Sequence, residues 1–259
     1  MLADPNIVPI NNWIGTIRVR EWADNDKIFF IPLHQYKEKI RTLPVNKPIL
    51  VIVGRDGNDA EFNNPCYNMT PSSMTILAHN NITVHPNNRP ASLFFPIGMP
   101  EVIYNCMTQV VQTLNELPTR TNKVLICHHT PPQSMSHYES RHHAYEYFSN
   151  KPFATVLGET PIDKWMYQIL CHRWVISPPG LGWDCDRTWQ SLYLGARPIL
   201  IRSVFTEEIH RRIPSVVLVN RWEDVTQEFL DKQPTNLEPS RIYLKSYWIE
   251  FIDNFKRNN

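Results

Sequence analysis

The chain has 259 residues, a length sufficient for two compact units. With 42% hydrophobic and 20% charged residues, the composition is that of a globular protein and excludes a disordered or fibrous one. The formal net charge is +1, so the basic excess of a nucleic-acid-binding domain is missing. No apolar run is long enough to span a membrane, and residues 1–10 lack the features of a signal peptide. These features predict a cytoplasmic protein that does not bind nucleic acid and has no membrane-spanning segment.

The five cysteines are an odd number and form no C-x-x-C pair. This pattern argues against a disulfide framework and against a structural zinc site. We expect reduced thiols, most of them buried.

Short β-branched runs alternate along the chain with amphipathic segments. The runs predict strands at 48–53, 123–127, 174–177, 198–201 and 215–219, with extra strands at 13–20, 76–84 and 91–95. The amphipathic segments predict helices at 33–43, 100–117, 140–148, 161–172, 185–194 and 224–230. Strands that alternate with helices indicate parallel sheets and an α/β fold.

A polar, proline-containing stretch at 117–122 divides the chain into an N-terminal unit, 1–118, and a second unit, 119–236. The remaining residues, 237–259, contain a helical pattern at 240–256 with a broad aromatic face. That face packs either back on the first unit or on its own unit.

The strongest local signal follows the predicted strand 174–177, which ends in Pro178-Pro179-Gly180. The prolines stop the strand ladder, and Gly180 allows the backbone to turn without a Cβ clash. Gly182 adds a second bare position before the next helix. A glycine-containing loop between a strand and a helix N-terminus directs backbone N–H groups and the helix dipole at an anion.

The helix after this loop carries the polar groups of the expected site. Asp184 or Asp186 caps its start, and Gly195 closes its end. Arg187, in the first turn, can grip a phosphate with two parallel hydrogen bonds. Gln190, one turn later, can reach a ribose hydroxyl. The alternative is a structural turn in which Arg187 forms a surface salt bridge and Gln190 is solvated.

A family resemblance enters with the residues of this segment. They are Ser177-Pro178-Pro179-Gly180, Gly182, Asp184-Cys185, Arg187-Thr188-Trp189, Leu192, Leu194-Gly195 and Pro198-Ile199. Together with 222–226 and the helix after it, they resemble the nucleotide-sugar-binding half of exostosin-like glycosyltransferases. The resemblance covers about residues 120–232. One departure is Gln190, where relatives usually carry a glutamate that holds the ribose.

The resemblance implies a GT-B fold, in which two Rossmann-like domains face a cleft and a C-terminal helix crosses back to the first domain. It also implies transfer of a sugar from a nucleotide-diphosphate donor, such as UDP-xylose, to a glycan hydroxyl. The reaction would proceed with inversion and without a metal or other cofactor. The implied donor-binding residues are His129, Arg141, Ser177, Pro179, Gly180, Gly182, Asp184, Arg187, Thr188 and Gln190.

A histidine-rich segment at 128–143 follows the first strand of the second unit. Its position places His128 and His129 at the same sheet edge as Gly180, and Arg141 near the start of the next helix. Relatives carry an arginine at a similar place, so we expect Arg141 and Arg187 to act as paired cations around the diphosphate. The alternative is a metal site formed by the histidines, although the spacing H-E-x-x-H is absent.

An inverting transferase needs a base that accepts the proton of the acceptor hydroxyl. The acidic loop after the strand 48–53 offers Asp56 and Asp59 as the candidates, unless they only form turns. Further candidates are Glu61, Asp24, Asp26 and His85. Two other functions stay open: a non-catalytic module that binds glycans or nucleotide sugars, and a metal-dependent hydrolase built on the histidines.

Overall fold

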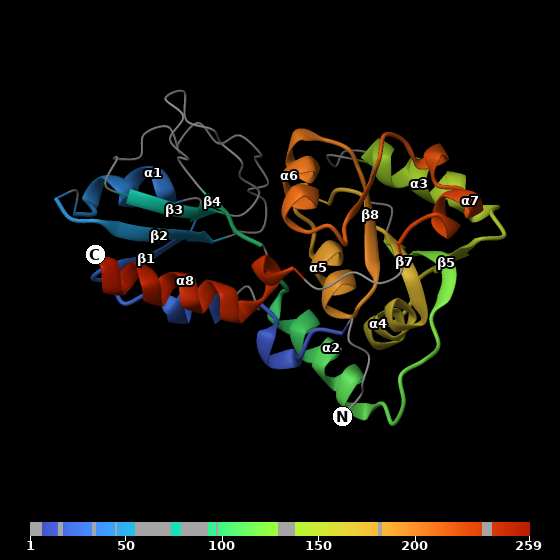
Figure 1. Cartoon of the computed structure of the whole chain (residues 1–259), viewed down its shortest axis with the longest axis horizontal. Coiled ribbons are helices and arrows are strands. Elements are labelled where there is room, and N and C mark those ends of the chain that lie inside the picture. The colour runs from blue at the N-terminus through green and yellow to red at the C-terminus, as the bar shows by residue number, and fades with distance from the viewer. Residues whose placement is uncertain are drawn as a thin grey trace.

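The computed structural model describes residues 7–14, 18–32, 35–44, 46–54, 74–78, 93–96, 98–128, 138–180, 183–234 and 240–259. These residues form two parallel sheets, one in each half of the chain, with helices packed on their faces (Figure 1). The chain is therefore an α/β protein, as the alternation of strands and helices predicted.

The first sheet has four parallel strands in the order β1-β2-β3-β4. They are β1 (Ile28–Pro32), β2 (Ile49–Gly54), β3 (Met74–Ala78) and β4 (Leu93–Phe94). Ile49, Leu50, Val51 and Ile52 of β2 are fully buried, because both faces of a parallel sheet are covered. On one face, α1 (Tyr36–Lys39) and the 3-10 turn Ile40–Thr42 pack against β2 and β3.

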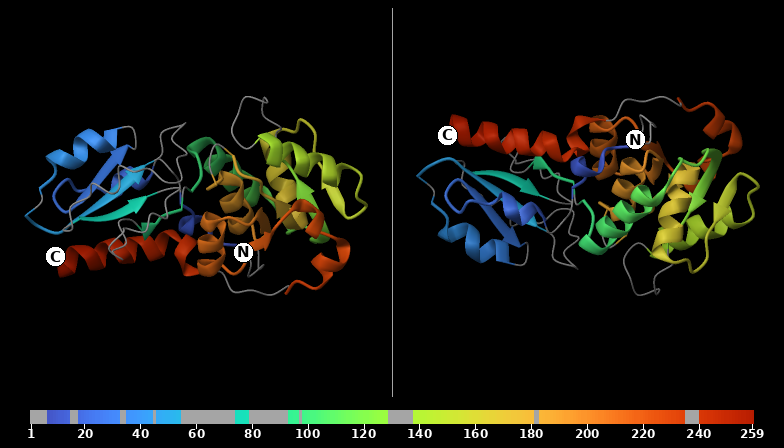
Figure 2. Two further views of the ribbon diagram at one scale, coloured as in Figure 1. Left: turned by 90° about the horizontal axis from the view of Figure 1, so that it is seen from above. Right: turned by 90° about the horizontal axis from the view of Figure 1, so that it is seen from below.

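The other face of this sheet shares a core with α8 (Lys245–Asn258), the last helix of the chain. All views show α8 running alongside the first sheet (Figures 1 and 2). Trp248 of α8 packs edge-on against Phe95, with 4.9 Å between the ring centroids. At the far end of α8, Lys256 Nζ lies 3.0 Å from the carboxylate of Asp24. The aromatic face predicted for 240–256 is therefore buried against the N-terminal half of the chain.

The second sheet has five parallel strands in the order β6-β5-β7-β8-β9. They are β5 (Thr121–Ile126), β6 (Ala154–Val156), β7 (His172–Ile176), β8 (Arg197–Ile201) and β9 (Val217–Val219). The chain steps from β5 to β6 and then returns past β5 to β7. The direction of winding therefore reverses between β5 and β7, which is the point where doubly wound sheets bind ligands.

Helices cover both faces of the second sheet. One face packs against α3 (Tyr138–Ser149), the 3-10 turn Trp222–Asp224 and α7 (Gln227–Asp231). The other face packs against α4 (Ile162–Cys171), α5 (Asp186–Tyr193) and α6 (Val204–Arg212). The helix α2 (Glu101–Thr113), N-terminal to the polar stretch 117–122, packs against α4 of this second unit.

Several predicted elements differ from the structure. The strand predicted at 13–20 is wrong, because Trp13 and Ile14 are buried in the core without a strand and Arg18–Trp22 is a 3-10 helix. β1 and β6 were missed: β1 ends on a proline, and β6 has only three residues. The helix predicted at 224–230 is a 3-10 turn followed by α7.

One hydrophobic core runs through both halves of the molecule. The segment Val8–Ile14 contributes Val8, Trp13 and Ile14 to this core and contacts α2, α8 and the end of α5. The Tyr193 hydroxyl of α5 accepts a hydrogen bond from Ile14 N at 3.2 Å and donates one to Tyr243 O at 2.9 Å. Met99 N donates to Ile14 O at 3.0 Å. Residues from both ends of the sequence therefore meet at a single tyrosine.

The described cysteines are all free. Cys127 is buried and Cys106, Cys171 and Cys185 are half-buried, so the prediction that most of the thiols are buried overestimated their burial.

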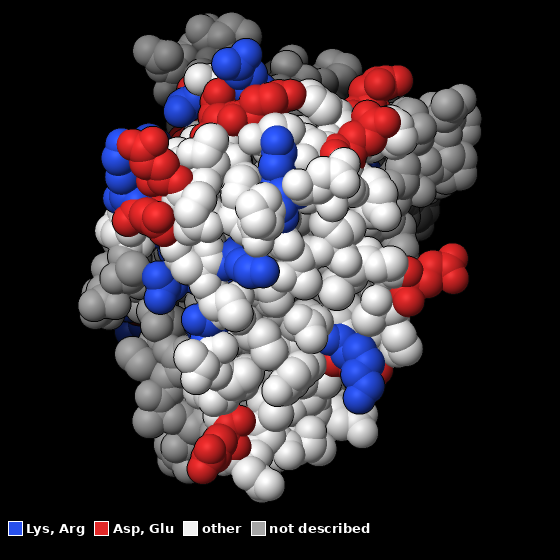
Figure 3. All heavy atoms as spheres, turned by 90° about the vertical axis from the view of Figure 1, so that its right-hand side faces the viewer, with Lys and Arg blue, Asp and Glu red and all other residues white. Residues whose placement is uncertain are grey.

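On the face in Figure 3, Lys and Arg lie among Asp and Glu. Among the helices that the structure describes, none combines the length and the apolar character needed to cross a bilayer.

Gly98 tests the packing of the segment Val8–Ile14. Its φ is +71°, and a Cβ there would lie 2.5 Å from Ile14 O, a backbone atom. We expect Gly98→Ala to lower the free energy of unfolding by about 2–4 kcal/mol, from strain and overpacking together. Gly158→Ala is the matched control, because a Cβ at Gly158 meets nothing within 4 Å. Urea unfolding of both variants checks this, and equal stabilities would contradict it.

The contact between Asp24 and Lys256 of α8 makes the free energy of unfolding depend on pH. Burial raises the pKa of Asp24, but hydrogen bonds from Ile28 N, Asp26 N, Lys256 Nζ and Lys27 N outweigh it and hold that pKa well below its usual range. A depressed pKa contributes stability above the unfolded pKa of about 3.9, and this stability is lost as the pH falls through the folded value.

Asp24→Asn should therefore lower the free energy of unfolding at pH 7 by about 1–2 kcal/mol, since the carboxylate is partly exposed. The difference between variant and wild type should shrink as the pH falls below about 4. Urea titrations at neutral and acidic pH measure it, and a difference independent of pH would contradict the assignment.

Candidate functional site

The candidate site lies at the carboxyl edge of the second sheet, where the winding reverses. Cys127 and His128 follow β5 there, and Ser177 follows β7. The helix α5 begins at Asp186, at the end of the loop that follows β7. This arrangement places the ends of two neighbouring strands and the start of a helix around one region.

Polar side chains hold the loop after β7 against α5. Ser177 Oγ lies 3.0 Å from Thr188 Oγ1, and both residues are buried. Ser177 N also donates to Ile199 O at 3.0 Å. Two predicted donor-binding residues therefore bond to each other and fix the position of the loop relative to the helix.

The backbone conformation at position 180 does not require a glycine. It is not among the positive-φ glycines, and an added Cβ would meet only Cys185 Sγ, at an ordinary contact distance of 3.5 Å. The expectation that Gly180 relieves a Cβ clash is therefore wrong. Pro178 and Pro179 before it are buried, and Gly180 itself is half-buried.

The start of α5 differs from the prediction that an aspartate caps it. The N-cap residue is Cys185, and no side chain caps the helix. Asp184 instead accepts a hydrogen bond from Trp189 Nε1 at 2.6 Å, between two buried groups. Asp184 therefore anchors the loop to the helix, as the sequence allowed, but the cap assignment was wrong. Gly195 ends the helix with a φ of +75°, as predicted.

Two arginines converge beside the start of α5. Arg187 is only 7% exposed, and its Nη1 lies 3.7 Å from Cys185 Sγ. Burial lowers the pKa of Arg141, the charge of Arg187 lowers it further, and Cys185 acts in the opposite direction. The two charges therefore interact, and the burial of Arg187 rules out the alternative in which it forms a surface salt bridge.

Nothing in the described part of the chain neutralises this pair. The Nε atoms of Arg141 and Arg187 are buried without a hydrogen-bond partner there, and neither guanidinium forms an ion pair with a described carboxylate. A buried cation without a counterion is strongly unfavourable. The described residues therefore leave the charge of the pair without a counterion.

Arg197 provides a comparison within the same sheet. It is 8% exposed, almost as buried as Arg187. Its guanidinium donates to Ser215 O at 3.1 Å and to Pro234 O at 2.5 Å, and it stacks on Trp174 at 4.9 Å. Burial lowers the pKa of Arg197 to about 10. The fold thus satisfies Arg197 with two carbonyls, whereas Arg187 meets thiols and its Nε has no partner among the described residues.

Gln190 lies one helical turn after Arg187 and is 2% exposed. Its Oε1 is buried without a hydrogen-bond partner among the residues that the structure describes. Every residue of α5 from Arg187 to Tyr193 is buried. A solvated position for Gln190 is therefore wrong.

The histidines are distributed over different contacts. His128, which is buried, places Nε2 2.9 Å from Arg141 O and so joins β5 to α3. His142 pairs with Glu146 at 3.1 Å, and His143 with Glu223 at 2.7 Å. Within the described residues, no three histidines, cysteines or acidic residues are grouped as metal ligands would be.

Several predicted site residues lie outside the described residues: His129 and Gly182 of the donor set, the base candidates Asp56 and Asp59, and the alternatives Glu61 and His85. The other two alternatives are engaged elsewhere. Asp24 holds the turn at 26–28 and pairs with Lys256, and Asp26 pairs with Lys47.

Sequence reasoning missed Cys185 and the role of Trp189. The thiol of Cys185 lies beside Arg187, and the indole of Trp189 binds Asp184. Their positions next to the predicted loop were the available signal. No protein-family model matches the chain, and no curated protein sequence matches it either.

The bond between Trp189 and Asp184 can be tested separately from its packing. Trp189→Phe removes the donor and leaves a buried carboxylate oxygen, so we expect a loss of about 1.5–3 kcal/mol in the free energy of unfolding. Trp165→Phe is the control, because the described group that Trp165 Nε1 faces is the weakly accepting thiol of Cys127, at no regular hydrogen-bond geometry. Urea unfolding checks both variants. A control that loses as much stability would show that ring size, not the hydrogen bond, matters.

Proposed function

We propose that this chain is a glycosyltransferase that takes a sugar from a nucleotide-diphosphate donor, with a UDP-sugar such as UDP-xylose as the first candidate. The observation that carries the proposal is the pair formed by Arg187, which is buried, and Arg141, which is half-buried, at the reversal point of a doubly wound sheet without a counterion among the described residues. A diphosphate would supply the missing negative charge.

In the proposed reaction the two guanidinium groups, the amide of Gln190 and a base each have a distinct role. As the bond between the anomeric carbon and the diphosphate oxygen breaks, the electron pair moves to the diphosphate. Two fixed guanidinium groups would stabilise this charge without reorganisation, and more strongly in a buried site than in water. The amide of Gln190 can donate to or accept from a ribose hydroxyl. The new bond forms to an acceptor oxygen, whose proton passes to a base, for which Asp56 and Asp59 remain our candidates.

The arrangement of the two units supports a GT-B architecture as part of the proposal. Helices α3 and α5 of the second unit carry the arginine pair, and α8 returns from the second unit to pack along the first sheet. In this proposal the first unit contributes the acceptor side, the second unit binds the donor, and inversion proceeds without metal. The fold alone does not determine the reaction, so the proposal depends on the site.

The first measurement is a thermal-shift screen against UDP, GDP, CDP and ADP, without metal and with manganese. A ligand that binds only the folded protein raises its stability, by about 2.7 kcal/mol at one hundred times its Kd. Stabilisation by one nucleotide without metal supports the proposal. Binding without transfer or donor hydrolysis would instead indicate a non-catalytic nucleotide-sugar-binding module. A shift with manganese alone would favour the hydrolase.

Arg187→Met gives a sharper result, because it replaces an unneutralised buried charge by an apolar side chain of similar length. We expect the unliganded variant to be as stable as the wild type or more stable, by up to about 2 kcal/mol. The stabilisation by nucleotide should disappear, since half of the cation pair is lost.

Arg197→Met is the matched control, an equally buried arginine whose partners are carbonyls. It should lose about 2–3 kcal/mol of stability, because two carbonyls lose their donor and the contact with Trp174 is lost. It should nevertheless keep the stabilisation by nucleotide. An Arg187→Met variant that still binds the nucleotide would refute the role of the pair.

A further inference from the structure

A cavity of about 430 Å³ lies beside α3, at the carboxyl ends of β8 and β9. Glu139, His143 and Glu146 of α3 form one side of it, and Asn220 and Arg221, after β9, form the other. Ile201, the last residue of β8, adds an apolar wall. The cavity is large enough for a small ligand.

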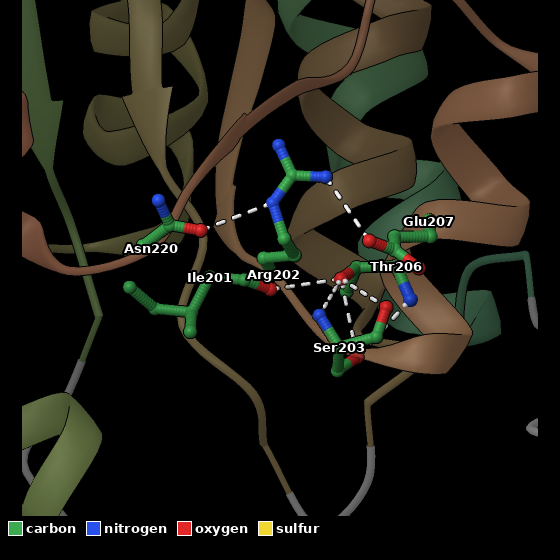
Figure 4. Close-up of polar contacts among 6 residues, drawn as sticks. All are labelled: Ile201, Arg202, Ser203, Thr206, Glu207 and Asn220. Carbon is green, nitrogen blue, oxygen red and sulfur yellow. Dashed lines mark hydrogen bonds and ion pairs between the residues drawn. The ribbon is translucent and has the colours of Figure 1, made fainter.

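The amide of Asn220 is held in one orientation. Arg202 Nε donates to Asn220 Oδ1 at 3.1 Å, and Arg202 Nη1 donates to Glu207 Oε1 at 3.1 Å (Figure 4). A guanidinium has only donors, so the amide oxygen must face it and the NH₂ group points away, as the figure shows. Asn220 therefore offers its NH₂ group to a ligand.

The support for Asn220 is connected to α6 and to the end of β8. Glu207 belongs to α6, whose first turn is closed by a capping box between Ser203 and Thr206 (Figure 4). Thr206 Oγ1 also donates to Ile201 O at 2.8 Å, which joins this turn to the end of β8. The polar group and the apolar wall of the cavity are thus fixed by one network.

The charges around the cavity differ from those of the arginine pair. Arg221 pairs with Asp224 at 3.1 Å, and His143 with Glu223 at 2.7 Å. The carboxylate of Glu139 has no ion-pair partner in the described ranges. Because each cation here already has a carboxylate, the cavity has no excess positive charge for a phosphate. Its available groups are carboxylate oxygens and an amide NH₂.

We propose that this cavity binds an uncharged sugar ring. A sugar hydroxyl both donates and accepts, so vicinal hydroxyls match carboxylate oxygens of Glu139 and Glu146 beside the NH₂ of Asn220. The apolar C–H groups of the ring match the wall formed by Ile201. The inference rests on the proposed function for its role in catalysis, where the sugar belongs either to the acceptor or to the donor.

The position of the cavity relates it to the donor site. Arg141 lies on α3 between Glu139 and His143, so one helix contributes both to the arginine pair and to the cavity. His128 holds the backbone of α3 at Arg141, and the Trp222 indole holds it at Ser140 through a bond of 3.0 Å. A diphosphate site and a sugar site would then share a fixed helix.

The test is saturation-transfer NMR of the full chain with xylose, galactose and glucose, together with binding measurements for UDP and for the UDP-linked form of each sugar. Asn220→Ala should weaken sugar binding about tenfold, since the hydrogen bonds of the amide are lost. Asn254→Ala is the matched control, because Asn254 is an exposed asparagine whose oxygen also accepts from an arginine, Arg257. It should leave sugar binding unchanged.

The outcomes distinguish the two sources of the sugar. Weaker binding of a free sugar, with UDP-sugar binding unchanged, assigns the cavity to the acceptor. Weaker binding of a UDP-sugar, with UDP binding unchanged, assigns it to the donor sugar. The inference is overturned if Asn220→Ala weakens neither, or if Asn254→Ala weakens sugar binding equally.

The two proposals can fail separately. If UDP and the other nucleotides do not stabilise the protein but a free sugar binds and Asn220→Ala weakens it, the proposed donor site fails and the sugar site remains. If Arg187→Met abolishes nucleotide binding but Asn220→Ala weakens the binding of no sugar, the sugar site fails and the proposed donor site remains.

Discussion

The burial of Arg187 is the constraint on which the rest of this structure depends. A guanidinium at 7% exposure, close to a second one, would gain free energy by moving into water, so the fold must hold it in place. The fold does so because α5 is enclosed from Arg187 to Tyr193. Hydrogen bonds between Ser177 and Thr188, and between Asp184 and Trp189, then fix the first turns of the helix. Much of the polar bonding around α5 thus serves to keep a charge in place.

The C-terminal end of α5, opposite Arg187, contacts both halves of the chain. The hydroxyl of Tyr193 joins Ile14 to Tyr243, and burial raises the pKa of Tyr193 far above its usual range, so it remains a neutral donor. Arg120, just before β5, donates to Leu194 O at 2.5 Å and to His172 O at 3.1 Å, which satisfies carbonyls where α5 and α4 end. A ligand at the start of α5 therefore contacts a helix whose end is fixed between the two halves of the chain.

The sequence predicted the α/β class because buried parallel strands read as β-branched runs, and 49–52 is such a run in both sequence and structure. Prediction from the sequence failed where contacts between distant residues determine the secondary structure or the burial of a side chain. Trp13 and Ile14 resemble a strand, but they are buried by Tyr104 and Tyr193, which are distant in sequence. The polar residues Arg187 and Gln190 resemble a solvated helix face, and only the surrounding segments reveal their burial. The loop and the two arginines were predictable, but the lack of a counterion for them among the described residues was not.

The shared core also limits how the chain can be divided. Met107 of α2 and Met166 of α4 belong to one cluster, although the polar stretch 117–122 separates them in the sequence. Cutting the chain in that stretch would expose apolar surface on both fragments, so neither would be an independent folding unit. Co-expressed fragments should instead reassemble, and the two halves should melt in one cooperative transition. The linker that looks like a domain boundary is therefore a permissible site for a chain break, but not for separating the two halves.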